Sequence, residues 1–371
     1  MNLQQLFLSG LVAAAASTAQ AVDLKLQAAV GHDSNPFKLA NSFDPGSAAF
    51  MASKIRLSHD IGDLRLYASL RHRSYESLAD EADTTRWNTG GRYKVAHSLW
   101  GSKARTSLSL NYGGLDKTYV SRSSGQVGTF SGQRIDDRYD YRQWDAQAKT
   151  RVKLSKPLAT GLRLKLRGRD YEDYQIAGLS DLDYRQLTLA NDWTFRPNKV
   201  SEFRGELSLT QREFDDKRQK ESSGALLAST DLEYRYYRVE LEYQRAFSGD
   251  FDAELTYAFE VREDNGPGYY DTDDHRLSLE LGYTPGNNEE VSLKLGYQDR
   301  KYVNTSTIDE SNDGEPSKKG YFGAFEASKR LPKWAGEPLF FAALRYEDYD
   351  SSDVVYIYDS AQVSAGVRLL F

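Results

Sequence analysis

The spacing of apolar side chains constrains this sequence more than any other feature. Side chains at every second position lie on one face of a β-strand, and this period recurs along the chain, for example in residues 162–167, 251–257 and 291–297. The C-terminal residues show it most clearly, with apolar side chains at Val363, Ala365, Val367, Leu369 and Phe371. The pattern predicts an all-β protein with long, two-faced strands.

The N-terminus predicts export. An apolar run from Leu6 to Ala16 precedes Ala19-Gln20-Ala21, which has the small-x-small pattern of a signal peptidase site. The run is too short to cross a bilayer as a helix. We therefore expect a signal peptide over residues 1–21 and one domain over residues 22–371. The alternative is a buried N-terminal helix.

Composition narrows the class of the exported domain. Mean hydropathy is −0.66, 39% of residues are hydrophobic and 27% are charged, so no later stretch could form a spanning helix. A closed β-barrel can cross a membrane with alternate apolar residues alone, and the 25 Tyr and 16 Phe suit its aromatic girdles. The absence of Cys excludes disulfides, thiol chemistry and Cys-based metal sites.

Turn-rich segments divide the chain into strands and alternate between tight and long. The tight ones lie near residues 61–63, 99–101, 156–161, 197–199, 248–250, 285–288 and 332–338. The longer ones lie near residues 32–46, 79–84, 120–137, 176–181, 215–228, 264–271, 305–317 and 351–353. This alternation predicts a transmembrane, antiparallel, up-and-down β-barrel of about 16 strands, with both chain ends on the short-turn side. The second face of the strands is too rich in Arg, Lys and Glu for the dry core of a soluble sandwich.

The C-terminal strand resembles the assembly signal of Gram-negative outer-membrane barrels. Val363, Val367, Leu369 and Phe371 carry the resemblance. It implies a location in the outer membrane of a Gram-negative bacterium. It also implies the partners of such barrels, which are outer-membrane lipid, lipopolysaccharide and, during insertion, the barrel assembly machinery.

The first predicted hairpin carries a second resemblance. Residues 31–39 are similar to the opening of β-barrel porins, some of which are associated with exopolysaccharide production. Asp33, Asn35, Phe37 and Lys38 match that opening, whereas His32 replaces the usual aromatic residue. The resemblance implies an outer-membrane conduit, including one for an anionic glycan, and it assigns no chemical role to these residues.

The charged face of the strands is expected to line the lumen, because charges on the lipid face are costly near the bilayer midplane. Its bases gather on the second to seventh strands: Lys54, Arg56, Arg65, Arg71, Arg73, Arg92, Lys94, Lys103, Arg105, Lys149, Arg151, Lys153, Arg163, Lys165, Arg167 and Arg169. We call these residues the basic wall. Acids gather later, on the opposing wall: Glu206, Glu240, Glu242, Glu254, Glu260 and Glu280. Either the basic wall guides anions through a wet pore, or the two walls pair across a filled barrel.

The long connection over residues 120–137 is the third outer loop by this count. In general porins the third loop folds into the barrel, so we expect a possible constriction that carries Arg134. The alternative is an exposed surface loop.

Enzymatic chemistry has one candidate, His275 beside Asp273 and Asp274. A histidine among acids is more often a solvated loop residue, and no phosphate-binding loop is present. We therefore predict no enzyme, no cofactor, no metal site and no nucleic-acid partner. The predicted function is a porin-like channel that passes small solutes, favouring anions or acidic oligosaccharides. An export conduit for an acidic exopolysaccharide and a plugged structural or adhesive barrel remain open, as does the oligomeric state.

Overall fold

The computed structural model describes residues 22–42, 46–76, 82–121, 125–304, 317–334, 336–352 and 354–371. The predicted signal peptide over residues 1–21 lies outside the described residues. Among those residues, no helix is long and apolar enough to cross a membrane.

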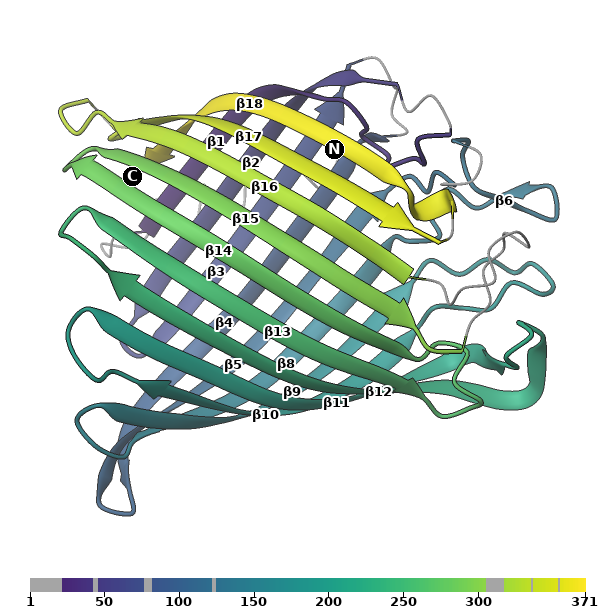
Figure 1. Ribbon diagram of the computed structural model, residues 1–371, viewed down its shortest axis with the longest axis horizontal. Coiled ribbons are helices and arrows are strands. Elements are labelled where there is room, and N and C mark those ends of the chain that lie inside the picture. The colour runs from purple at the N-terminus through teal and green to yellow at the C-terminus, as the bar shows by residue number, and fades with distance from the viewer. Residues whose placement is uncertain are drawn as a thin grey trace.

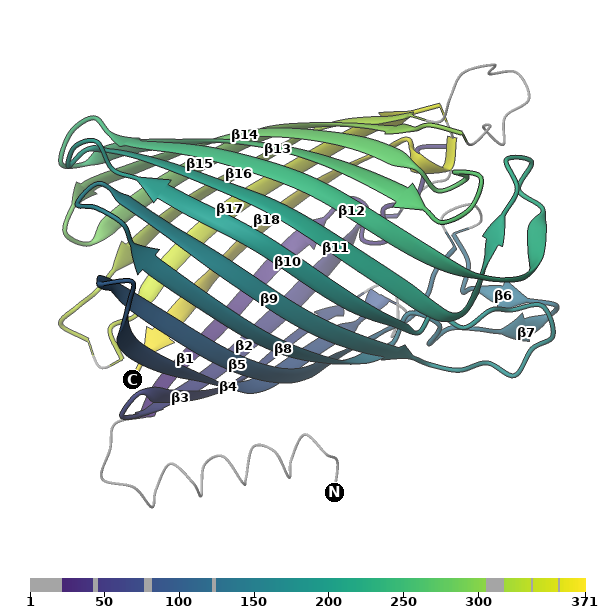
Figure 2. The same cartoon turned by 90° about the horizontal axis from the view of Figure 1, so that it is seen from below.

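Sixteen antiparallel strands form one closed barrel, which confirms the predicted fold (Figures 1 and 2). Each strand pairs with its neighbours along the chain, and the last strand pairs with the first. The barrel strands are β1 (Val22–Asp33), β2 (Ala48–Ile61), β3 (Leu64–Tyr75), β4 (Thr84–Leu99), β5 (Ser102–Lys117), β8 (Tyr141–Lys153), β9 (Leu158–Tyr171), β10 (Tyr184–Phe195), β11 (Ser201–Lys220), β12 (Leu226–Ala246), β13 (Phe251–Asp264), β14 (Thr272–Gly286), β15 (Glu289–Tyr302), β16 (Ser317–Arg330), β17 (Leu339–Ser351) and β18 (Tyr358–Leu370). Strands of 12 to 21 residues are long enough to cross a bilayer when tilted.

The two chain ends close the barrel on the short-turn side. Leu24 and Phe371 exchange backbone hydrogen bonds of 3.0 and 2.9 Å, and Lys25 pairs with Leu370 in the β1–β18 register. The turn at this end between β2 and β3 contains Gly62 at a φ of 59°, a left-handed conformation that glycine adopts without strain. We call this end the inner mouth and the end with the longer loops the outer mouth.

Two of the predicted long loops contain strands. The loop expected over residues 215–228 is mostly a continuation of β11 and β12, whose pairing carries register shifts after Glu213 and after Arg218. The loop expected over residues 120–137 contains its own hairpin, β6 (Thr129–Phe130) and β7 (Gln133–Arg134). Both corrections have the same physical cause, because polar strands outside the membrane lack the apolar period that marks a strand.

The outward face of the barrel is apolar. Exposed Leu and Val side chains cover the middle of the strands, and large aromatic side chains lie toward the strand ends. Toward the outer ends lie Tyr112, Trp144, Tyr237, Tyr257, Tyr321 and Tyr346, and toward the inner ends lie Phe195, Phe203, Tyr283, Phe340 and Phe371. An apolar band between two aromatic groups is the surface of a transmembrane β-barrel.

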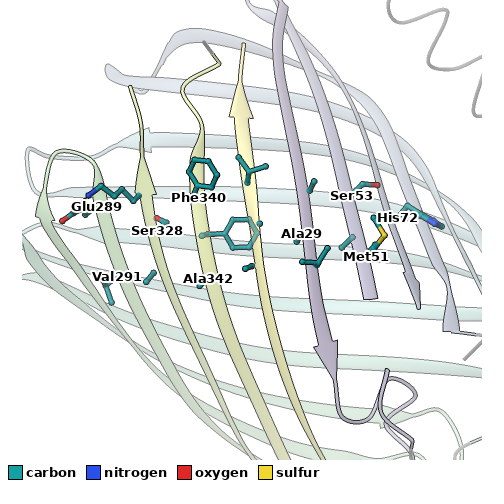
Figure 3. A pocket seen from close by; sticks show the side chains of 18 of the residues that line it. Ala29, Met51, Ser53, His72, Glu289, Val291, Ser328, Phe340 and Ala342 are labelled. Carbon is teal, nitrogen blue, oxygen red and sulfur yellow. Dashed lines mark hydrogen bonds and ion pairs between the residues drawn. The ribbon is translucent and has the colours of Figure 1, made fainter. Parts of the chain in front are cut away.

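Small side chains make one hollow in this outward face, where β1 and β18 meet. Figure 3 shows Met51, Ser53 and His72 on one side of this groove and Phe340 and Ala342 on the other. Its volume is about 1030 Å³. Because its lining is mostly on the lipid-facing side of the strands, the groove is separate from the lumen.

Candidate functional site

The polar face of the strands is the inner, concave face. Its side chains reach past a neighbouring strand to the next one: the Lys149 ammonium on β8 lies 2.7 Å from Asp192 on β10, and Arg163 on β9 lies 2.6 Å from Glu206 on β11. Such contacts form on the concave side of a barrel, where side chains converge. The lumen is therefore lined by charged and polar groups.

The strand register places every predicted wall residue on this lumen-facing side. The basic wall lies on β2, β3, β4, β5, β8 and β9, and the predicted acidic residues lie on β11, β12, β13 and β14. Two further cations, Lys25 on β1 and Arg86 on β4, share the same face and extend the basic wall. The alternation of the sequence already places both residues on this face. The guiding role of the walls stays a prediction.

The two walls differ in how far their charges are paired. Of the six predicted acids, all but Glu254 form ion pairs: Glu206 with Arg163, Glu240 and Glu260 with Arg238, Glu242 with Arg204 and Glu280 with Lys294. Three of the four wall bases on β9 are also paired, since Arg163 pairs with Glu206 and both Lys165 and Arg167 share Asp145 at 3.2 and 2.7 Å. Arg169 instead donates to the Gln143 side-chain oxygen. Five of the six predicted acids are thus ion-paired.

Much of the basic wall has no such partner. Within the described ranges, these residues form no ion pair with a carboxylate: Lys54, Arg56, Arg71, Arg92, Lys94, Lys103, Arg105 and Lys153. The contrast leaves an excess of positive charge on one side of the lumen.

Part of this excess gathers in a cavity at the inner mouth. The cavity has a volume of about 630 Å³ and lies between the inner ends of β4, β5, β8, β9 and β10. Its cationic lining consists of Arg92, Lys94, Lys103, Arg105, Lys149, Arg151, Lys153, Lys156 and Arg196. Of these, only Lys149 and Arg196 pair with carboxylates of the described residues, Asp192 and Glu202. We call this cavity the inner basin.

The overall shape has counterparts among solved structures. CdiB from Acinetobacter baumannii matches with a TM-score of 0.53 and 10% sequence identity, over 95% of this chain and 60% of that one. OccK8 (OprE) from Pseudomonas aeruginosa matches with a TM-score of 0.49 at 12% identity, over 95% of this chain and 98% of its own. An anion-selective porin from Comamonas acidovorans matches with a TM-score of 0.46 at 12% identity, over 95% and 99%. No protein-family model and no curated protein matches the sequence.

The chain has the fold of a transmembrane β-barrel. The closed sheet, the even strand number, the apolar outer band and the short turns at one end are together the features of barrels in the Gram-negative outer membrane. At these sequence identities the likeness to solved structures extends to the fold alone.

The third outer loop differs from its expected form. In Figure 2 its hairpin, β6 and β7, lies beyond the ends of the barrel strands rather than inside the lumen. Arg134 pairs with Asp136 at 2.8 Å and its side chain is 57% exposed. The described hairpin therefore does not constrict the lumen, and it matches the alternative of an exposed surface loop.

The first outer loop enters the lumen instead. Lys38 reaches the inner face of β17, where its ammonium lies 2.5 Å from Glu347 and 5.8 Å from the Tyr358 ring. Phe37 packs against a buried cluster that includes Phe50 and Tyr75 on the lumen side of β2 and β3. This loop therefore narrows the outer mouth.

Two polar residues from the resemblance at the first hairpin hold this loop. Asn35 is 1% exposed; its side chain accepts a hydrogen bond from the Leu39 N–H at 2.8 Å and donates to the carbonyls of Leu39 and Asp359 at 2.9 and 3.1 Å. Asp33 accepts hydrogen bonds from Tyr75 and Gln362. The sequence resemblance located these residues, but only the structure gives them a role.

The candidate dyad at His275 does not form with Asp274. Adjacent residues of a strand point to opposite faces, so His275 lies on the outward face, where it stacks on Phe259 and contacts the Tyr257 hydroxyl at 2.9 Å. Asp274 lies inside and is 2% exposed. No group of three or more His, Asp or Glu side chains in the described part of the chain is placed to hold a metal ion.

The residues of the C-terminal resemblance lie on the outward face of β18. Val363 and Phe371 are 54% and 60% exposed. Their role as an assembly signal stays a prediction.

Proposed function

We propose that this chain is a passive channel of the Gram-negative outer membrane that passes small solutes and favours anions. The observation that carries the proposal is the inner basin, where cations outnumber the carboxylates that could neutralise them. Rings and clusters of Arg and Lys are the devices by which pores select anions. The proposal includes removal of residues 1–21 and assigns no enzymatic step.

The charge difference between the walls supports the preference for anions. Ion pairs hold five of the six carboxylates of the acidic wall, whereas Arg92, Lys103 and Arg105 have no ion pair with a described carboxylate. In a water-filled bore with low-dielectric walls an uncompensated charge acts over a longer distance than at an open surface, so it raises the local concentration of counter-ions. Chloride or a small carboxylate would therefore enter more readily than potassium.

The test is the reversal potential of single channels in a planar bilayer under a KCl gradient. We expect a potential of the sign that chloride selectivity gives, and a shift toward zero in the double variant K103Q/R105Q. Lys329→Gln is the matched control, since Lys329 is exposed on the outward face and paired with Glu289 at 2.8 Å. Cation selectivity of the wild type, or no effect of the double variant, would overturn the proposal. A barrel without conductance would favour the plugged alternative.

A further inference from the structure

A second group of cations lies at the outer mouth, far from the inner basin along the strands. Arg212 and Lys217 on β11 and Arg262 on β13 form what we call the outer cation cluster. Each rests on aromatic rings. The Arg212 guanidinium carbon lies 4.4 Å from the Tyr184 ring centre, that of Arg262 lies 4.9 Å from Tyr234, and the Lys217 ammonium lies 5.0 Å from Phe214.

The outer cation cluster has no anionic partner in the described part of the protein. Arg212 donates to the Gln186 side-chain oxygen at 3.1 and 3.0 Å, and Arg262 donates one bond, to the Tyr270 carbonyl at 2.7 Å. Lys217 has neither a hydrogen bond nor an ion pair with any described residue. Donor groups of all three cations therefore remain available.

The nearest carboxylates are occupied elsewhere. Asp264 accepts hydrogen bonds from the backbone N–H groups of Gly266, Gly268 and Tyr270, and Asp271 accepts one from the Asp264 N–H. These bonds shape the loop between β13 and β14, and neither carboxylate forms an ion pair with a cation of the cluster in the described residues.

Neighbouring strands show the contrasting arrangement. On β14 and β15, Arg276 and Arg300 both bind the buried carboxylate of Asp274. The chain thus supplies an internal counter-ion for one pair of lumen arginines at the outer mouth, but none for the outer cation cluster.

Repulsion within the cluster acts on Lys217, which lies beyond the membrane-spanning part of β11. Burial has the largest effect on the pKa of Lys217, followed by the positive charges of Arg262, Lys220, Arg212 and Arg138, and together they lower it to about 8. A bound anion would relieve this repulsion. In the free protein the aromatic rings offset part of it, at about 0.5–2 kcal/mol for each cation–π contact, beside the hydrogen bonds of Arg212 and Arg262 to neutral oxygens.

We propose that the outer cation cluster is a binding site for a saccharide that carries carboxylate groups. Guanidinium groups match carboxylates in a bidentate geometry. The rings of Tyr236 and Tyr270 are only partly buried beside the cluster, and they offer a flat apolar surface with a hydroxyl at its edge, as a sugar ring requires. The site deepens the proposed function by naming a solute class, and it rests on that function only in requiring a water-filled lumen.

The test is block of the single-channel current by trigalacturonate added on the outer side, with a neutral glucose trisaccharide and inorganic phosphate as comparison probes. We expect trigalacturonate to block, the neutral sugar to have no effect, and phosphate to block at least tenfold more weakly. Arg262→Gln and Lys217→Gln should each weaken the trigalacturonate block about tenfold, the value of one charge-assisted hydrogen bond. Tyr236→Leu should weaken it while leaving the phosphate response unchanged.

Control variants keep the two proposals distinguishable. Lys319→Gln on the outward face should leave the block unchanged, and K103Q/R105Q should alter the reversal potential without altering the block. If a variant does not conduct, its folding is first checked by circular dichroism. Isothermal titration calorimetry of the detergent-solubilised barrel then compares the binding of the same three probes. Anion selectivity without any trigalacturonate binding would overturn the site and leave the channel intact. Equal binding of phosphate and trigalacturonate would overturn the saccharide assignment.

Discussion

The first outer loop gives the sharpest prediction, through Asn35→Ala. The Asn35 side chain makes three hydrogen bonds, and the substitution removes all of them while leaving the Leu39 N–H and the Asp359 carbonyl without these partners. At about 1 kcal/mol for each bond, the docked loop loses about 3 kcal/mol relative to the undocked one. The ratio of undocked to docked states should therefore rise about a hundredfold. The barrel itself should persist, because its strand pairing does not involve this side chain.

Single-channel recording detects the change. Because Lys38 and Phe37 of this loop contact the inner wall, undocking should widen the outer mouth and give longer dwell times in a state of higher conductance. Asn198→Ala is the matched control: Asn198 accepts two backbone hydrogen bonds in an inner-mouth turn, outside the proposed constriction. Equal conductance and equal dwell times in the wild type and Asn35→Ala would refute a constriction by the first loop.

Three further predictions concern the same lumen. Lys38→Met should increase conductance less than Asn35→Ala does, because its ion pair with Glu347 is partly exposed and is worth about 1 kcal/mol or less; the same recordings rank the two variants. Asp274→Asn should lower the free energy of unfolding by about 3–5 kcal/mol, because two arginines lose their buried counter-ion. Urea titrations of the barrel in vesicles measure this change. The control Asp250→Asn, in an exposed turn, should have little effect. Trigalacturonate block should weaken as pH rises through about 8, because the pKa of Lys217 is lowered to about 8 and its ammonium loses its charge there. In Lys217→Gln this pH-dependent loss of block should be absent. A loss of block that persists in the variant would assign the titration to another group.

The faces of the strands were predictable from sequence because alternation is a local property. Each residue of the predicted basic wall is separated from its strand neighbours of the same face by one position, which is mostly apolar, so its side follows once the lipid-facing set is known. The same logic fails past Glu213, where a register shift breaks the alternation, and Lys217 consequently escaped prediction. The placement of His275 in a loop differs from the structure for a related reason: it lies within β14, where adjacent residues point to opposite faces and separate it from Asp274.

The loops were the less predictable part. The third loop was expected inside the barrel by analogy of position, whereas the first loop enters it, held by side-chain bonds from Asn35 to a carbonyl 324 positions away in the sequence. A contact between residues so far apart in the sequence produces no periodic pattern from which the position of the loop could be predicted.

The amino-acid sequence alone fixed the export expectation, the alternating strands, the approximate strand number and the excess of bases on one side of the lumen, because each is set by composition or by neighbours a few residues apart. The tertiary structure alone decided which charges are neutralised. Ion pairs such as Arg163–Glu206 join different strands across the concave face, and they hold most carboxylates of the acidic wall while the inner basin and the outer cation cluster keep unpaired cations. The net field in the lumen depends on these distances, which only closure of the barrel establishes.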